Sequence, residues 1–157
     1  MKVSILLVFI SIFLENIINL YFSNFKFLSP LFTLVSLYYI NYNFKFKKNY
    51  FIFCLATGII YDLIFTNFYI LNGLLFLVIS LLIRMVIGKK RLGLCKNILF
   101  ICFIIIIYNL LLFLIFNFYS YKLYSFLEFI YILKYFFLGN IMYSVILYLL
   151  FKKRILS

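Results

Sequence analysis

The sequence contains no histidine and no tryptophan, a single proline, a single alanine and only three acidic residues. Without histidine, the chain cannot form histidine-containing zinc sites or a nucleophile activated by a histidine base. The three cysteines, Cys54, Cys95 and Cys102, lack metal-ligand spacing. Cys54 and Cys102 lie in apolar runs, where free cysteine behaves as a small hydrophobic residue. We therefore interpret all three as structural and expect no metal or other cofactor.

The chain also lacks the motifs of phosphate chemistry. It has no phosphate-cradling glycine loop, and its acidic residues, Glu15, Asp62 and Glu128, form no paired aspartate cluster of the kind that binds a diphosphate through a metal ion. A hydrolase, a phosphotransferase or a lipid-modifying enzyme would have to work with these acids and tyrosines alone. We therefore expect a protein that is not an enzyme.

Apolar residues, in contrast, are abundant. Hydrophobic residues make up 69% of the chain and charged residues 11%, far from the balance of a soluble domain. Some apolar runs reach about 20 residues, which is the length needed to cross the hydrocarbon core of a bilayer. The sequence thus predicts an all-α membrane protein, with residues 1–157 forming a single integral membrane domain.

The order of apolar runs and polar breaks predicts six transmembrane helices. The first run resembles a signal peptide, but it has no small-residue cleavage site, and we expect an uncleaved helix. Pro30 fits the first turn of the second helix, where its missing N–H has no cost. The predicted helices span about residues 3–22, 30–44, 50–65, 69–87, 97–118 and 126–151.

The net charge of +12 is distributed in short clusters between the apolar runs. Six helices place most basic residues on one side: Lys2, Lys45, Lys47, Lys48, Arg84, Lys89, Lys90, Arg91, Lys96, Lys152, Lys153 and Arg154. Only Lys26 and Lys122 fall on the other side. The positive-inside rule then puts both termini in the cytoplasm, beside anionic lipid headgroups. A nucleic-acid partner is not expected, because no continuous basic surface exists.

One stretch of the third helix combines small residues with an intramembrane acid. Cys54, Gly58 and Asp62 follow one another at four-residue spacing, so they share one helical face. Small residues in such a stripe permit close contact between helices. An acid in hydrocarbon costs roughly 2.5–3.5 kcal/mol on insertion scales, and it therefore usually faces protein or a wet cavity. The stripe is expected to face another helix.

Glu15, Asp62 and Lys134 are candidates for an intramembrane polar lock. At about 1.5 Å of rise per residue, the topology places all three in the outer half of the bundle, where Lys134 would pair across helices with Asp62 or Glu15. Such a lock would fix helix register, although buried charges in membranes also mark ion or substrate paths. Arg84, near the cytoplasmic end of its helix, is expected to reach the headgroups.

At these positions the chain resembles the MreD family of bacterial rod-shape-determining proteins. Pro30 matches the proline that opens the second helix of that family. Gly58-Ile59-Ile60-Tyr61-Asp62-Leu63-Ile64 is similar to its Gly-Leu-Leu-x-Asp-Leu-Leu-like stretch. Leu71-Asn72-Gly73-Leu74 is similar to the Leu-Gly-Leu-like turn that follows, with Asn72 inserted before Gly73. The resemblance extends over essentially the whole chain.

The resemblance implies a non-enzymatic subunit of the machinery that elongates peptidoglycan in the bacterial cytoplasmic membrane. Its implied partners are a single-span protein, MreC, and through it the MreB filament, the RodA glycosyltransferase and a class B penicillin-binding protein. No small-molecule substrate is implied. The bundle is also similar to the substrate-binding S components of energy-coupling-factor transporters, which leaves transport of a vitamin or metal ion as the alternative.

Overall fold

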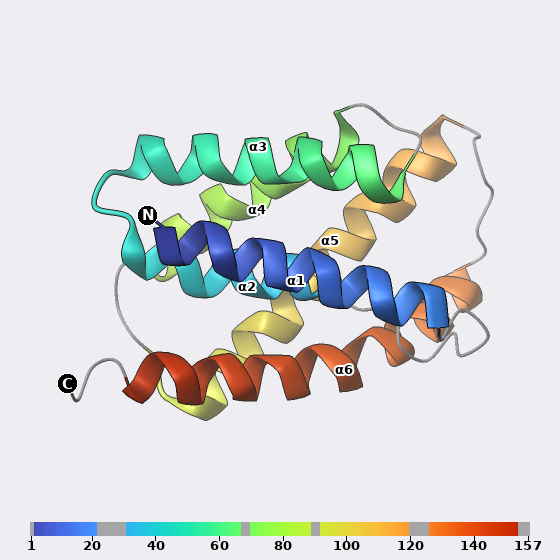
Figure 1. Ribbon diagram of the computed structural model, residues 1–157. Helices are drawn as coiled ribbons and strands as arrows, with labels where there is room; N and C mark the ends of the chain where they lie inside the picture. Colours follow the sequence, from blue (N-terminus) through green and yellow to red (C-terminus); the bar gives the residue numbers. More distant parts are fainter. Residues whose placement is uncertain (1, 22–30, 67–69, 89–91, 120–125, 154–157) are drawn as a thin grey trace.

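Helices make up nearly all of the computed structural model, which describes residues 2–21, 31–66, 70–88, 92–119 and 126–153 (Figure 1). Of these residues, 91% are helical and none lies in a strand. The elements are α1 (Lys2–Tyr21), α2 (Phe32–Ile40), the 3₁₀ turn η2 (Asn41–Asn43), α3 (Lys47–Phe65), α4 (Leu71–Val86), α5 (Leu94–Phe118) and α6 (Phe126–Lys153). The prediction of an all-α protein is confirmed, and the helix ends lie within a few residues of the predicted ones.

Three described helices are long and apolar enough to cross a membrane, namely Val3–Tyr21, Lys47–Phe65 and Leu94–Phe118. Large apolar side chains cover their outward faces, among them Phe13 of α1 and Leu63 of α3, which are 64% and 68% exposed. Exposed apolar surface of this extent is compatible with lipid contact. The structure thus supports membrane association through these three helices.

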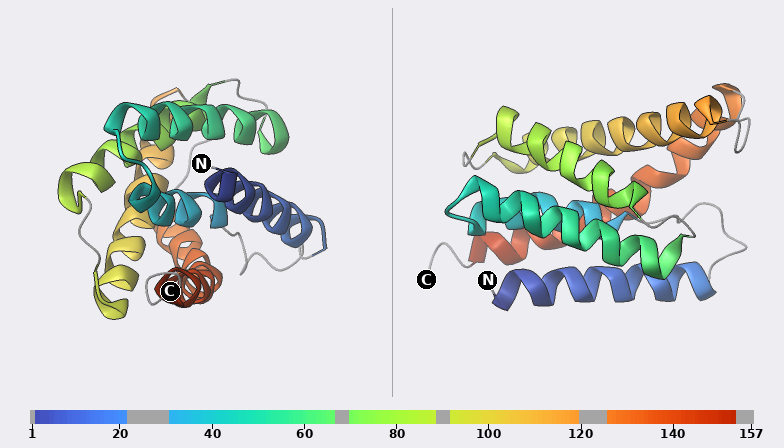
Figure 2. Two further views of the ribbon diagram at one scale, coloured as in Figure 1. Left: turned by 60° about the vertical axis from the view of Figure 1, so that its left-hand side comes forward. Right: turned by 90° about the horizontal axis from the view of Figure 1, so that it is seen from above.

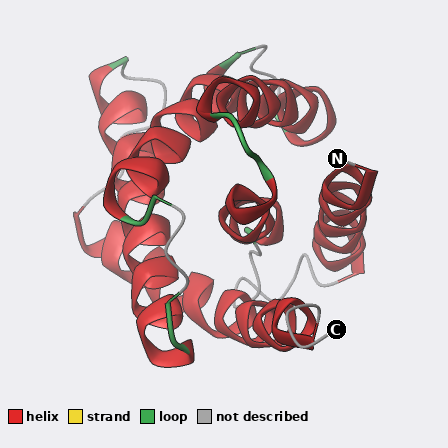
Figure 3. Ribbon diagram, turned by 90° about the vertical axis from the view of Figure 1, so that its left-hand side faces the viewer, coloured by secondary structure: helices red, strands yellow, loops and turns green. Residues whose placement is uncertain are grey.

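The helix α2 lies in the middle of the bundle, and the other helices surround it (Figure 3). All nine of its residues are buried, and it is apolar on every side, as a fully enclosed helix should be. At about 1.5 Å per residue, nine residues extend about 14 Å, less than half of the roughly 30 Å hydrocarbon core. The six-span topology therefore stays a prediction.

Polar contacts fasten α2 to the last two helices. The backbone N–H of Leu31 donates to Oδ1 of Asn140 in α6 at 2.8 Å, and the Tyr39 hydroxyl donates to the Ser144 carbonyl at 3.0 Å. The Tyr38 hydroxyl donates to Oδ1 of Asn97 in α5. Side-chain hydrogen bonds of this kind tie together helices whose apolar packing alone is weakly specific.

The beginning of α1 and the end of α6 lie at the same end of the bundle (Figures 1 and 2). The helix α3 also begins there, and its first residues, Lys47 and Lys48, are exposed together with the preceding Lys45. Lys96, in the first turn of α5, is exposed as well. Basic side chains therefore gather at the end of the molecule where the two termini lie.

Candidate functional site

The Asp62 carboxylate caps the beginning of α4 from the neighbouring helix α3. Its Oδ2 accepts hydrogen bonds from the backbone N–H groups of Asn72 (2.7 Å) and Gly73 (3.3 Å). Its Oδ1 accepts from Asn72 Nδ2 and from Thr66 Oγ1, both at 2.7 Å. The first N–H groups of a helix have no partner within the helix and form the positive end of its dipole. A fully buried carboxylate is therefore stabilised there.

Gly58 allows α3 to approach the first turn of α4. A Cβ atom at this position would lie 2.5 Å from the Asn72 carbonyl oxygen and 2.6 Å from the Gly73 Cα. Both neighbours are backbone atoms, so they cannot move aside unless α4 moves. A Cβ atom at Gly73 would in turn lie 3.0 Å from Cγ1 of Ile59. The two glycines thus set the separation at which Asp62 can cap α4.

Asn72 is a site residue whose role the sequence interpretation missed. It donates to Asp62 from both its backbone and its side chain, while its Oδ1 accepts a hydrogen bond from the Tyr108 hydroxyl at 2.6 Å. Because Tyr108 belongs to α5, the network joins three helices. The available signal was an amide residue in the first turn of an apolar helix. Only a short connection separates that helix from the preceding one, which carries an intramembrane acid. We call Gly58, Asp62, Asn72, Gly73 and Tyr108 the α3–α4 joint.

Cys54 continues the joint one turn before Gly58. Its side chain is fully buried and lies beside Tyr50 and Ser80, the latter on α4. The Cys54–Gly58–Asp62 stripe therefore faces α4 along two turns of α3. Both Asp62 oxygens are occupied by donors, and in the described part of the chain no group of three or more His, Cys, Asp or Glu side chains could hold a metal ion. This arrangement supports helix packing.

Glu15 is the second fully buried acid, and it lies against the beginning of α2. Its Oε2 accepts hydrogen bonds from the backbone N–H (3.3 Å) and the Oγ1 of Thr33. Its Oε1 has no hydrogen-bond partner among the described residues. Glu15 and Asp62 thus both cap a neighbouring helix, but only Asp62 does so with both of its oxygens.

Pro30 and the side chains of Glu128 and Lys134 fall outside the described residues. So do the side chains of most basic residues on which the topology prediction depends: Lys2, Lys26, Lys89, Lys90, Arg91, Lys122, Lys152, Lys153 and Arg154. The pairing of Lys134 with Asp62 or Glu15 therefore stays a prediction.

Arg84 does not extend to the surface as expected, because it is buried (6% exposed) against the turn that follows α2. Its Nη1 donates to Oδ1 of Asn41 at 2.7 Å and to the Asn41 carbonyl at 3.3 Å. The Asn41 Nδ2 in turn donates to the carbonyl of Gly88, which ends α4 with a positive φ of 60°. Polar partners inside the protein thus replace the expected headgroup contact.

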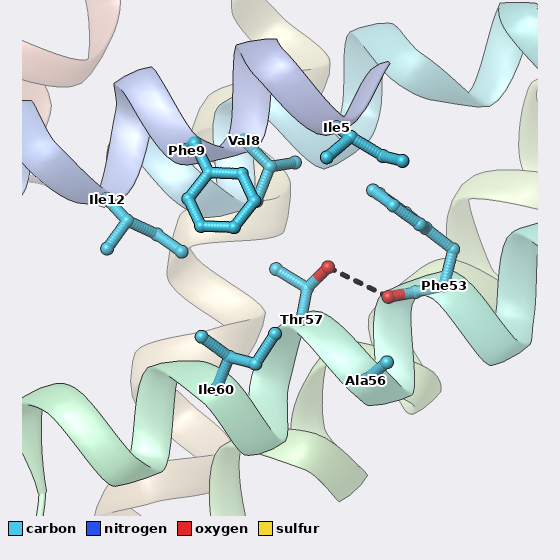
Figure 4. Close-up of a pocket in the computed structure, with 8 residues that line it drawn as sticks. All are labelled: Ile5, Val8, Phe9, Ile12, Phe53, Ala56, Thr57 and Ile60. Atoms are coloured by element: carbon cyan, nitrogen blue, oxygen red, sulfur yellow. Dashed lines mark hydrogen bonds between the residues drawn. The ribbon is translucent and has the colours of Figure 1, made fainter. Parts of the chain in front are cut away.

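An apolar cleft of about 100 Å³ separates α1 from α3 (Figure 4). Its one hydroxyl-bearing side chain, Thr57, donates to the Phe53 carbonyl at 2.8 Å and offers no free donor to the cleft. The lining residues are Ile5, Val8, Phe9, Ile12, Phe53, Ala56, Thr57 and Ile60. Ligand pockets usually measure about 300–1,000 Å³ and contain a few directed polar groups, so the cleft is too small and too apolar for a vitamin.

Comparisons of the chain with protein-family models, curated proteins and solved structures found no match.

Proposed function

We propose that the chain is a non-enzymatic integral membrane subunit of a bacterial cell-elongation complex, similar to the MreD family. In this role it acts as a scaffold for a single-span partner such as MreC, and through it associates with MreB, RodA and a class B penicillin-binding protein. The observation that carries the proposal is the α3–α4 joint. The residues on which the resemblance depends, Gly58, Asp62 and Gly73, meet in one closed packing contact.

The absence of a reactive arrangement at this joint supports a scaffold over an enzyme. The Asp62 oxygens accept four hydrogen bonds from the protein itself, so they are not available as a base or a nucleophile. A group that acts on substrate must be able to reach it. The motif therefore contributes rigidity, which is what a subunit that positions other proteins requires.

The proposal includes a six-span topology in the bacterial cytoplasmic membrane, with both termini in the cytoplasm. Two features support this orientation. The basic residues Lys45, Lys47, Lys48 and Lys96 are exposed at the end of the bundle where both termini lie. Cytoplasmic loops carry such an excess of lysine and arginine. Cysteine-accessibility labelling at either terminus of the chain in intact cells tests the orientation.

Transport as an S component is the weaker candidate. It requires an outward-opening cavity for a vitamin or a metal ion, and the cleft between α1 and α3, at about 100 Å³ and without a free polar group, does not supply one. The polar groups of the α3–α4 joint are likewise bonded to one another. These features favour the scaffold.

Co-purification tests the proposed function. The affinity-tagged chain is expressed with the MreC-like protein of its own genome, and we expect the two to elute together from solubilised membranes. Asp62→Ala should abolish co-elution, because the joint that sets the arrangement of α3 and α4 is lost. Glu128→Ala is the matched acid control and should leave co-elution intact, with size-exclusion profiles reporting the folded state of both variants.

Two results would contradict the scaffold. In one, the unmodified chain fails to retain the MreC-like protein and instead retains a pair of ATPase subunits, as a transporter would. In the other, removal of the chain from its native host leaves cell width and length unchanged under conditions in which removal of the MreC-like protein makes the cells round.

A further inference from the structure

The structure describes two buried acids, Glu15 and Asp62. Of these, only Glu15 has a carboxylate oxygen without a donor. The side chain is 0% exposed. Both donors from Thr33 reach Oε2, while Oε1 has no hydrogen-bond partner among the described residues. A buried polar atom without a partner is unfavourable, and more so when the group is charged. Such an atom in a folded protein requires an explanation, and a bound ion is one.

Tyrosine side chains of three different helices lie near this carboxyl group. The Tyr61 hydroxyl of α3 and the backbone N–H of Phe32 lie beside it, and neither completes a hydrogen bond to Oε1. Tyr108 of α5 and Tyr143 of α6 lie within electrostatic range of Glu15, and Tyr108 is also within range of Asp62. No positively charged side chain among the described residues interacts with Glu15.

Those surroundings decide which kind of ligand Oε1 can take. A further anion is disfavoured, because it would lie against the Glu15 carboxylate itself. A divalent metal ion usually takes several carboxylates, or carboxylates with histidines or cysteines, and the described residues provide no group of three such side chains. A single positive charge matches a single carboxylate.

We propose that Glu15 is a buried binding site for a small monovalent cation, either a proton or a sodium ion, which Oε1 binds at the junction of α1, α2 and α3. The Tyr61 hydroxyl, which lies beside the carboxyl group, is the expected second oxygen ligand of the cation, and Thr33 holds the opposite carboxylate oxygen in place. Asp62 does not share this role, since both of its oxygens are occupied. This proposal does not depend on the proposed scaffold function.

The scarcity of acids in the sequence makes the site directly observable. The chain has two glutamates, Glu15 and Glu128, and one aspartate, Asp62. In a Glu128→Gln variant labelled with δ-carboxyl ¹³C-glutamate, the only labelled side chain is that of Glu15. The same variant labelled with γ-carboxyl ¹³C-aspartate reports Asp62 alone, which supplies a matched buried carboxyl as the control.

The experiment records carboxyl ¹³C spectra of the full chain in lipid nanodiscs at neutral pH, first in choline chloride and then in sodium chloride at the same ionic strength. If the cation is a proton, the Glu15 signal appears at the neutral-acid position in both salts. If it is sodium, the signal lies at the ionised position and moves on the change from choline to sodium. In either case we expect the Asp62 signal to be unaffected by sodium.

An ionised Glu15 signal that does not respond to sodium would overturn the proposal. A second overturning result involves Lys134, whose side chain lies outside the described residues. If the Glu15 signal changes from ionised to neutral acid only after Lys134→Met, then the positive charge belongs to the chain and not to a bound cation. We expect Lys134→Met to leave the signal where it was.

A further variant separates the site from general folding effects. Thr33→Val removes one donor to Oε2 and keeps the Glu15 carboxyl group, and we expect it to move the Glu15 signal but not the Asp62 signal. If Glu128→Gln does not yield folded protein, the unmodified chain still has only two labelled glutamates. The Glu15 signal is then the one that is lost on Glu15→Gln, and it is judged by the same outcomes.

Discussion

Glu15 and Asp62 are both fully buried, and both cap a helix from the neighbouring one, but their surroundings differ. Asp62 receives donors on both oxygens, from the first turn of α4 and from Thr66. Glu15 receives its donors on one oxygen, and its other oxygen has no partner in the described part of the chain. The number of donors, and not the depth of burial, therefore separates an acid that builds the fold from one that can bind something.

The largest effect is expected from Asp62→Asn. The amide would present an NH₂ group to donors that now meet a carboxylate oxygen, which leaves buried N–H groups without acceptors. Hydrogen bonds to charged groups contribute about 1.5–3 kcal/mol each, so we expect the free energy of unfolding to fall by about 3 kcal/mol or more. Reversible unfolding of the purified chain in mixed detergent measures this free energy. A loss below about 1 kcal/mol would show that the hydrogen bonds to Asp62 do not set it apart from Glu15 as a support of the fold.

Gly58→Ala tests the geometry of the same joint without changing its polar groups. The new methyl group would meet the backbone of Asn72 and Gly73, and overpacking of this kind typically costs about 1–3 kcal/mol. The matched control is Gly93→Ala at the beginning of α5, where a Cβ atom would have no neighbour within 4 Å, and its effect should stay within about 0.5 kcal/mol. Equal unfolding midpoints for the two variants would contradict the close approach of α3 and α4.

Tyr108→Phe removes a single hydrogen bond from the periphery of the joint. Asn72 Oδ1 would lose its donor, and we expect a loss of about 1 kcal/mol in the free energy of unfolding. Tyr119→Phe, at a position that is 74% exposed at the end of α5, should have no measurable effect. If Tyr108→Phe and Tyr119→Phe have the same free energy of unfolding, the Tyr108 hydroxyl does not contribute to the network.

Glu15→Gln is expected to have the smallest effect of the four. Glutamine keeps a carbonyl oxygen for Thr33 and removes the charge from a carboxyl group whose other oxygen lacks a donor. We expect a change within about 1 kcal/mol in either direction, measured under the same conditions as Asp62→Asn. If Glu15→Gln lowers the free energy of unfolding as much as Asp62→Asn does, the two acids contribute equally to the stability of the fold.

The sequence was sufficient to predict the helices and the helical face on which Gly58 and Asp62 lie. Both follow from local rules, namely the length of apolar runs and the four-residue spacing of one helical face. The observed helices begin and end within a few residues of the predicted ones. Prediction was accurate because these features depend on neighbours along the chain.

The partners of the polar side chains could not be predicted in the same way. Asp62 was expected to face another helix, but its spacing did not indicate that it would cap the helix that follows its own, through Asn72 and Gly73. Arg84 was expected at the headgroups and is bonded to Asn41 instead. Each outcome depends on the crossing angle and separation of two helices, which are determined by packing across the whole bundle and not by spacing along one helix.

The enclosed position of α2 has a consequence for how the protein is made. The N–H of Leu31, just before α2, and the Tyr39 hydroxyl are bonded to Asn140 and Ser144, which belong to α6 and leave the ribosome about 100 residues later. Until α6 arrives, one side of α2 lacks its cover and these donors lack their acceptors. A chain released before α6 is complete would therefore expose its own centre, which makes the arrival of α6 the step that covers α2 during biogenesis.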